Sequence, residues 1–200
     1  MKYKILLVGC GWRSQIYRRA VANLSNEFEF CGILMHYEQR AEEITKETGI
    51  RATGSFDTAL SWQPDFAILC ISRSATKEWL VRFMEHQIPV LCETPPANTV
   101  AELNEIWKEN VRLNGKVQVA EQYFLQPYYH AVQTVIDSGL LGEILSVNMS
   151  AIHGYHAMSI FRKFLGIGFE NCTITGNRYE FPVTKTRNRA GWHETGEVIT

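Results

Sequence analysis

Short apolar runs that alternate with helical segments are the feature that most constrains the fold of this chain. The runs YKILLVG, FEFCGILM, DFAILCIS and IPVLCE each end in a turn, and each is followed by a stretch that favours a helix. Strands that are apolar on both faces are typical of parallel sheets covered by helices on both sides. We therefore predict a Rossmann-type parallel sheet domain of the α/β class over residues 1–120, with KVQVA as its last strand.

The pattern changes after Ala120. Gln126–Ser138 and His156–Leu165 favour helices, and each is followed directly by a glycine. Between them GEILSVNMSAI, residues 142–152, alternates in part and predicts a strand of a half-exposed sheet, and NCTITGNRYE after the second helix looks extended. We therefore predict a second domain of the α/β (α+β) type over residues 121–200, with a mostly antiparallel sheet that these residues leave incomplete.

The overall composition excludes several classes of partner. Among 200 residues, 20 basic and 21 acidic side chains give a net charge of -1 without a polybasic run, so neither nucleic acid nor an anionic membrane is an expected partner. No apolar stretch approaches the roughly 18 residues of a membrane span. The five scattered cysteines form no CxxC pair, which favours a reduced, cytoplasmic protein with buried thiols.

The turn after the first strand, in LLVGCGWRSQIYRRAV, predicts a dinucleotide site. Gly9 and Gly11 supply the first two glycines of a G-x-G-x-x-G fingerprint, and Ser14 is a small residue at the third position. The first glycine permits the tight turn, and the second lets the backbone approach a pyrophosphate at the start of the following helix. Trp12 and Arg13 are candidates to cover the phosphates and pair with them. The alternative is a purely structural turn.

The end of the second strand bears on the choice between NAD and NADP. An NAD site usually has an acidic residue there, which binds the ribose hydroxyls. In GILMHYEQR that place is taken by Met35 and His36, and the nearest acid is Glu38. His36 and Arg40 are suited to a 2′-phosphate, so we expect NADP more than NAD. The alternative is that both side chains are simply exposed.

Five segments resemble, in their order and spacing, the Gfo/Idh/MocA oxidoreductases, the family of glucose–fructose oxidoreductase and inositol dehydrogenase. They are VGCGWRS, QPDFAILCIS, VLCETPPANTVAEL, SGLLGEI and HGYHAMSIFRKFLG. The resemblance covers essentially the whole chain. It implies a nucleotide-binding domain followed by a domain with a large, mostly antiparallel sheet, which lies beside the cofactor and often forms dimers. Family members are usually much longer than this chain.

The resemblance also implies roles at the strand end VLCETPPANTV. The family carries Glu-Lys-Pro there, and its lysine contacts the substrate hydroxyl beside the nicotinamide. Glu93 and Pro95 match, whereas Thr94 replaces the lysine. Threonine can donate a hydrogen bond, but it cannot supply a cation or a useful base. Ser72, Glu93 and Pro95 are the implied cofactor-binding positions, and Lys77 stands where the family often has a histidine.

The second domain supplies candidates for proton transfer. The family often has a histidine followed one turn later by an acid at the head of a helix; His156 matches, but Ser159 stands in place of the acid. His156 is one candidate proton donor; the alternative is a histidine that merely caps or packs. Tyr123, where the first domain meets the second, is the other candidate, and the alternative is a packing aromatic. Lys163 lies two turns beyond His156 and can share its face. A metal pair of His153 and His156 is disfavoured, because no third ligand has suitable spacing.

These observations lead to an expected function. Without the lysine and the acid, oxidation of simple alcohols is disfavoured. We expect an NAD(P)-dependent oxidoreductase that reduces an activated C=N, C=C or C=O bond of a small-molecule substrate, as relatives such as biliverdin reductase do, with Thr94 orienting the acceptor. The alternative is a non-catalytic dinucleotide or sugar sensor on the same fold, as the yeast galactose-pathway repressor is. The second-domain sheet is expected to form a homo-oligomer.

Overall fold

The first part of the chain forms one six-stranded parallel sheet, as the alternating pattern predicts. The computed structural model describes residues 1–150, 154–177, 179–183, 186–188, 191–193 and 196–199. The strand order is β3-β2-β1-β4-β5-β6, and every neighbouring pair is parallel. The strands are β1 (Tyr3–Val8), β2 (Phe28–Leu34), β3 (Ala52–Thr53), β4 (Phe66–Leu69), β5 (Val90–Cys92) and β6 (Val117–Val119). The Rossmann-type sheet is thus confirmed.

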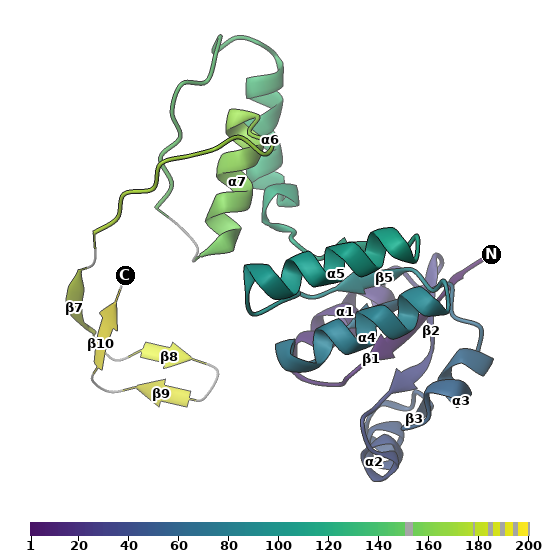
Figure 1. Cartoon of the computed structure of the whole chain (residues 1–200). Helices are drawn as coiled ribbons and strands as arrows, with labels where there is room; N and C mark the ends of the chain where they lie inside the picture. The colour runs from purple at the N-terminus through teal and green to yellow at the C-terminus, as the bar shows by residue number, and fades with distance from the viewer. Residues whose placement is uncertain (151–153, 178, 184–185, 189–190, 194–195, 200) are drawn as a thin grey trace.

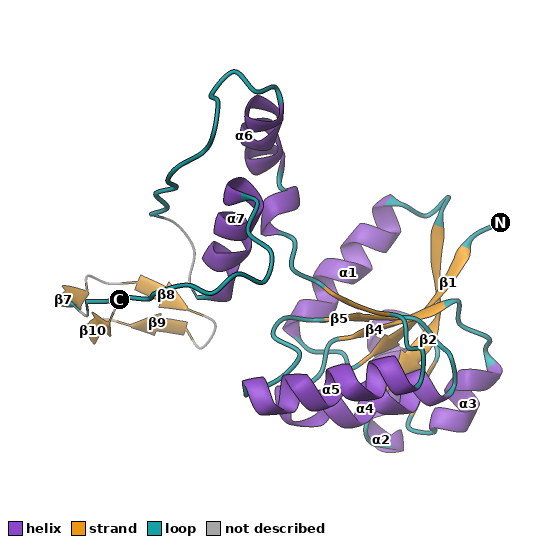
Figure 2. Cartoon of the chain, turned by 45° about the horizontal axis from the view of Figure 1, so that its top comes forward, coloured by secondary structure: helices purple, strands orange, loops and turns teal. Residues whose placement is uncertain are grey.

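Helices connect the strands and cover both faces of the sheet. They are α1 (Trp12–Asn23), α2 (Glu38–Thr48), α3 (Phe56–Ser61), α4 (Arg73–Glu85) and α5 (Val100–Arg112). In Figure 1 α4 and α5 lie side by side across the sheet, and Figure 2 shows α1 on the opposite face. The start of α5 is fixed by Thr99, whose side chain accepts a hydrogen bond from the Glu102 N–H. Such an N-cap is the usual role of threonine at this position.

β1 shows how the sequence buries both faces of the sheet. Leu6 and Val8 lie in one core with residues of α4 and α5, and Ile5 and Leu7 lie in the opposite core with residues of α1 and α2. All four side chains are at most 2% exposed. Burying each of them contributes about 1.5–3 kcal/mol relative to an exposed position. A strand whose last four residues are all apolar therefore has an energetic reason to lie in the middle of the sheet.

Two further helices follow the sheet and pack on each other. They are α6 (Pro127–Asp137) and α7 (Tyr155–Leu165), preceded by the short 3-10 helix η1 (Tyr123–Leu125). Tyr129 of α6 and Ile160 and Phe164 of α7 form a small core of their own. Gly166 ends α7 in the left-handed conformation, at φ 65°. Both helices were predicted, and the glycine explains where α7 ends.

The strand predicted over residues 142–152 is not formed in its described part. Residues 142–150 have no strand partner, and residues 151–152 lie outside the described part of the chain. Val147 and Met149 pack on the small core of α6 and α7, but Leu145 is 83% exposed. Partial alternation alone does not make a strand, because its backbone N–H and C=O groups need a neighbouring strand. The expected antiparallel sheet is thus not clearly present.

The last described residues pair as two short antiparallel ribbons. β7 (Glu180–Val183) pairs with β10 (Gly196–Ile199), and β8 (Thr186–Asn188) pairs with β9 (Gly191–His193). The predicted extended segment 171–180 forms no strand over residues 171–177. No helix of the described residues is long and apolar enough to cross a membrane.

Candidate functional site

The site is built around the point where the strand order reverses. β1 lies between β2 and β4, so the chain leaves β1 towards one edge and later continues towards the other. In open α/β sheets, ligands bind outside the carboxyl ends of the strands at such a point. The predicted glycine turn, residues 9–11, follows the carboxyl end of β1 directly.

Gly9 is required by the sheet itself. Its φ of +82° is in the left-handed region, and its N–H donates to the Leu34 carbonyl oxygen at 2.9 Å. A Cβ at this position would lie 2.6 Å from the Cys70 carbonyl oxygen. The ends of β1 and β4 therefore approach too closely for any other residue.

Gly11 has a different reason to be glycine. It precedes α1 with an ordinary φ of −78°, and a Cβ added there would meet no atom within 4 Å. The backbone around it faces open space beside the first N–H groups of α1, and no acidic residue occupies the first turn. Ser14 is fully buried, and its hydroxyl donates to the Gly11 carbonyl oxygen at 2.6 Å. This arrangement leaves room for an anion at a helix N-terminus.

A cavity of about 400 Å³ adjoins the glycine turn at the carboxyl ends of β1, β2 and β4. Its walls are mostly apolar, with few polar groups, as is usual for sites that take an aromatic ligand. It brings together three predicted cofactor residues, Gly9, His36 and Ser72, which come from three different segments of the chain. Trp79 of α4 also lines it and was not foreseen from the sequence.

Of the charged side chains after β2, none lines the cavity. Glu38 is held elsewhere, because its carboxylate accepts from the Gly54 N–H at 2.5 Å and from the Thr53 hydroxyl at 3.2 Å. Arg40 pairs with Glu43 and Glu47 on the exposed face of α2. His36, which stacks edge-on against Tyr37, is therefore the polar side chain that the end of β2 contributes to the cavity.

The strand end at Glu93 is tied to α1. The Glu93 carboxylate accepts from the Tyr17 hydroxyl at 2.5 Å and pairs with Arg13, whose Nε lies 3.0 Å from its second oxygen. Burial, and then the hydrogen bond to the Glu93 carboxylate, raise the pKa of Tyr17 far above its ordinary value. The guanidinium of Arg13 also lies 5.3 Å from the ring centre of Trp12. Two of the predicted cofactor residues, Arg13 and Glu93, are thus each other's partners.

Thr94 and Pro95 follow directly at this corner, joined by a cis peptide bond. Thr94 is half-buried, and its hydroxyl forms no hydrogen bond with any residue in the described part of the chain. No hydrogen bond joins it to His156 or Tyr123. Ser72 lies directly before α4, and its hydroxyl is 3.2 Å from the Ser74 hydroxyl.

His156 lies in the first turn of α7 and is buried against residues of another element. Its Nδ1 lies 2.6 Å from Oε2 of Glu121, which follows β6. The ring of Tyr123 lies 4.3 Å away, so the two predicted proton donors are in contact. Sequence reasoning missed Glu121. Its position directly after the last strand, at the same sheet edge as Glu93, was the available signal.

The Glu93 group and Glu121 line a common second cavity. Arg13, Tyr17, Glu93 and Glu121 all line a space of about 570 Å³ between α1, the ends of β5 and β6, and η1. Glu93 stands at the position of the family's Glu-Lys-Pro motif, and Glu121 contacts His156. The two carboxylates therefore line the same cavity.

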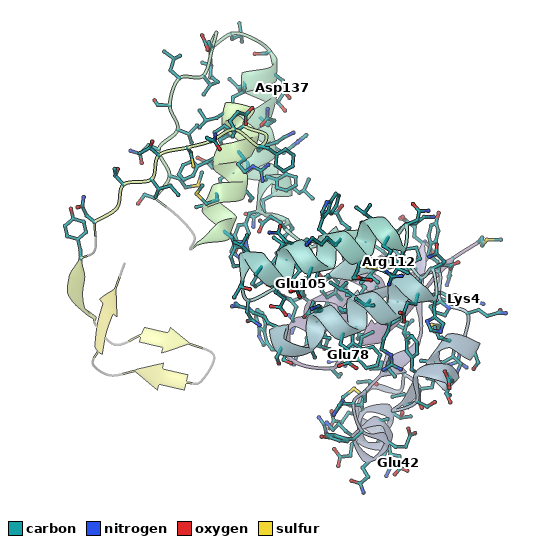
Figure 3. All side chains as sticks on the ribbon, viewed as in Figure 1. Lys4, Glu42, Glu78, Glu105, Arg112 and Asp137 are labelled. Carbon is teal, nitrogen blue, oxygen red and sulfur yellow. The ribbon has the colours of Figure 1, made fainter. Side chains whose placement is uncertain are left out.

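The two lysines that could replace the family lysine lie elsewhere. Lys77 of α4 pairs with Glu105 of α5 on the surface, where Glu105 is labelled in Figure 3. Lys163 lines a separate space of about 410 Å³ with Arg162. Ser159, at the position of the family acid, donates its hydroxyl to the His156 carbonyl oxygen at 2.8 Å. Within the described residues, no group of three or more His, Cys, Asp or Glu is placed to hold a metal ion.

Two comparisons with solved structures show the fold. An oxidoreductase from Agrobacterium radiobacter, in complex with NAD+, L-tartaric acid and magnesium, matches with a TM-score of 0.64 at 20% identity, over 72% of this chain and 42% of that one. The WlbA dehydrogenase from Bordetella pertussis, in complex with NADH and UDP-GlcNAcA, matches with a TM-score of 0.63 at 21% identity, over 72% and 44% of the two chains.

Sequence comparison shows the family. The inositol 2-dehydrogenase of Rhodococcus jostii is 29% identical over 113 residues, which cover 55% of this chain and 31% of that enzyme. The chain spans less than a third of the length of the curated relatives it matches. A family model described as "Oxidoreductase family, NAD-binding Rossmann fold" matches residues 3–121, more than half of the chain. The chain therefore belongs to the Gfo/Idh/MocA oxidoreductase family, whose NAD-binding Rossmann domain it contains.

Proposed function

We propose that the chain binds NAD(P) at the β1–α1 turn and belongs to an enzyme that transfers a hydride between this cofactor and a small-molecule substrate. The observation that carries the proposal is the open space at Gly11 beside the N-terminus of α1, next to the apolar cavity of Gly9, His36 and Ser72. The first would hold the pyrophosphate and the second the adenosine. A bound nicotinamide would supply or accept the hydride.

The residues around Glu93, Thr94 and His156 have different proposed roles. Arg13 and Tyr17 hold Glu93, which fixes the strand end that carries Thr94 and Pro95. Thr94, whose hydroxyl is not used by any described residue, would donate a hydrogen bond to the substrate. His156 would exchange a proton with the reacting atom, and the Tyr123 ring packs against it. Because Thr94 cannot take a hydroxyl proton as a lysine can, we favour reduction of an activated C=N, C=C or C=O bond.

The cofactor that we favour is NADP. The acid closest to the end of β2, Glu38, is occupied by Gly54 and Thr53 and is not placed to bind ribose hydroxyls. His36 remains at the cavity and can donate to a 2′-phosphate. Arg40 adds little to this preference, because Glu43 and Glu47 of its own helix already neutralise it.

A non-catalytic sensor on the same fold is the second candidate. The replacement of the family lysine by Thr94 favours it, since a sensor needs the cofactor turn but no proton-transfer group at that corner. A sensor would bind the dinucleotide and would transfer no hydride to any acceptor.

A substrate panel distinguishes the two. The protein would be mixed with NADPH or NADH and carbonyl, imine and sugar acceptors, and nicotinamide absorbance would be followed. We expect turnover with an activated acceptor, and we expect His156→Ala to lower it by about 10²–10⁴-fold, the usual contribution of general acid catalysis, while cofactor affinity is unchanged. Rapid oxidation of polyols would contradict the reductive direction. Tight cofactor binding without turnover across the panel would favour the sensor.

A further inference from the structure

The pair formed by Glu121 and His156 joins two segments that are far apart in the sequence. Glu121 follows β6, and His156 lies in the first turn of α7, 35 residues later; their side chains are 17% and 5% exposed. Burying a carboxylate at the ring nitrogen of a buried histidine is costly unless the two groups satisfy each other. A contact of 2.6 Å between Nδ1 and Oε2 provides that compensation.

The carboxylate is itself held in place. Its second oxygen, Oε1, accepts a hydrogen bond from the Tyr123 N–H at 3.2 Å, so both oxygens have defined partners. Groups that face the His156 ring include this carboxylate, the Tyr123 ring at 4.3 Å and the Tyr155 ring at 4.4 Å. Among these groups, the Glu121 carboxylate is the one that contacts a ring nitrogen.

The geometry decides which ring nitrogen keeps a proton. An ionised carboxylate only accepts hydrogen bonds, so Nδ1 must carry the hydrogen that lies between His156 and Glu121. Nε2 is then the nitrogen at which the ring gains or loses a proton. The same logic operates wherever a carboxylate orients a proton-transferring histidine.

We infer that Glu121 is the positioning residue of His156 and replaces the acid that the family carries where this chain has Ser159. The inference rests on the proposed function. In the reductive direction the ring starts as the imidazolium, its Nε2–H bond breaks, and the proton forms a bond to the substrate atom. The electron pair of that bond stays on Nε2 and leaves the neutral ring, while the other proton stays bonded to Nδ1 and hydrogen-bonded to Glu121. The hydride that balances the reduction comes from the reduced nicotinamide cofactor.

The tautomer of His156 tests this directly and needs no substrate. Long-range ¹H–¹⁵N spectra of the imidazoles would be recorded at a pH at which the ring is neutral, and the His156 signals would be assigned from their loss in His156→Asn. We expect the Nδ1–H tautomer in the unaltered chain. In Glu121→Ala the ring should shift to the Nε2–H form that predominates in free histidine. Glu78→Gln, a change on the surface of α4 (Figure 3), should leave the tautomer unchanged.

Two outcomes would overturn the inference: an Nε2–H tautomer in the unaltered chain, or an Nδ1–H tautomer that persists in Glu121→Ala. The first does not depend on Glu121→Ala, so a folding defect in that variant does not protect the inference.

Kinetics supply a second readout on the full-length enzyme. Glu121→Gln keeps the shape of the side chain but can donate to Nδ1 and reverse the tautomer, so we expect kcat to fall at least about 100-fold with little change in KM or cofactor affinity. Glu121→Asp should restore part of the rate, because it returns an acceptor. Equal kcat values for the unaltered protein and Glu121→Gln would sink the positioning role. No turnover of any acceptor by the unaltered protein would instead sink the proposed function, whatever the tautomer.

Discussion

At the scale of single residues, the two glycines of the first turn serve different purposes. Gly9 has a positive φ and no room for a Cβ against Cys70, so it is needed to fold the sheet. Gly11 has an ordinary φ, and no described atom lies where its Cβ would be, so packing within the described part of the chain does not exclude a side chain there. The natural explanation for Gly11 is a ligand that approaches the backbone.

This difference predicts unequal effects of alanine. Gly9→Ala should lower the free energy of unfolding by at least about 1–3 kcal/mol, the usual cost of a strained backbone, because the new Cβ also meets the Cys70 oxygen. Gly11→Ala should cost less, about 1 kcal/mol at most, because Gly11 is the N-cap of α1, where alanine is less favourable than glycine, but the new Cβ meets no described atom. Urea unfolding followed by circular dichroism measures both. Equal losses of stability would contradict the assignment of Gly11 to a ligand.

His36 gives a second prediction at this scale, concerning the choice of cofactor. His36→Asp places a carboxylate at the cavity edge, where it can accept from ribose hydroxyls and repel a 2′-phosphate. We expect the ratio of the Kd for NADP to the Kd for NAD to rise by about 10-fold or more, since a charged hydrogen bond is worth about 1.5–3 kcal/mol. Calorimetric titration of both cofactors measures the ratio. An unchanged ratio would mean that His36 does not meet the 2′-position.

At the scale of elements, α1 is fastened to the end of β5. Tyr17 and Arg13, one turn apart on α1, both bind the carboxylate of Glu93. The helix that would hold the phosphates and the strand end that would face the substrate therefore form one unit. A displacement of α1 should therefore also displace the end of β5, and the reverse.

The hydrogen bond from the Tyr17 hydroxyl to Glu93 should contribute measurably to the free energy of unfolding. Tyr17→Phe removes a hydrogen bond to a charged group and should cost about 1.5–3 kcal/mol. Tyr128→Phe, at a side chain 72% exposed, is the matched control and should cost almost nothing. Chemical denaturation compares the two. Similar values for both variants would show that the Glu93 contact does not stabilise the fold.

The raised pKa of Tyr17 has a consequence at alkaline pH. In the folded chain burial and the Glu93 carboxylate keep the phenol protonated, whereas in the unfolded chain it ionises near pH 10. The folded state then binds one more proton, so the stabilising effect is present below about pH 10 and is lost as pH rises. Above pH ~10, the free energy of unfolding of the unaltered chain should fall faster than that of Tyr17→Phe, by up to about 1.4 kcal/mol per pH unit. Parallel loss in both would contradict the raised pKa.

The elements also show what the sequence can predict and what it cannot. β1 to β6 and their helices can be predicted from local patterns. The spacing of apolar residues distinguishes strands from helices, and capping residues mark helix ends, as Thr99 does at the start of α5. Tyr17–Glu93 and Glu121–His156 join residues 76 and 35 positions apart. No local pattern encodes such pairs, since they depend on which strand ends meet. The strand expected over 142–152 failed for a related reason: a strand depends on its neighbour.

At the scale of the whole molecule, apolar side chains remain uncovered beyond the sheet. Leu140, Leu141, Leu145 and Ile174 are 60–84% exposed. We propose that this surface associates with a second copy of the chain. Light scattering after size-exclusion chromatography should then show a mass above 22.9 kDa that falls on dilution. A monomer with cooperative unfolding at all concentrations would contradict the proposal.

The central claim is that the β1–α1 turn binds a nicotinamide dinucleotide, and a titration of NADPH and NADH into the protein followed by nicotinamide fluorescence tests it most directly. The account predicts saturable binding of one dinucleotide per chain. It also predicts that Gly11→Val abolishes this binding, because the added side chain fills the space at the start of α1, while the melting temperature stays within a few degrees. Undiminished binding by a folded Gly11→Val variant, or no binding by the unaltered chain, would contradict the claim.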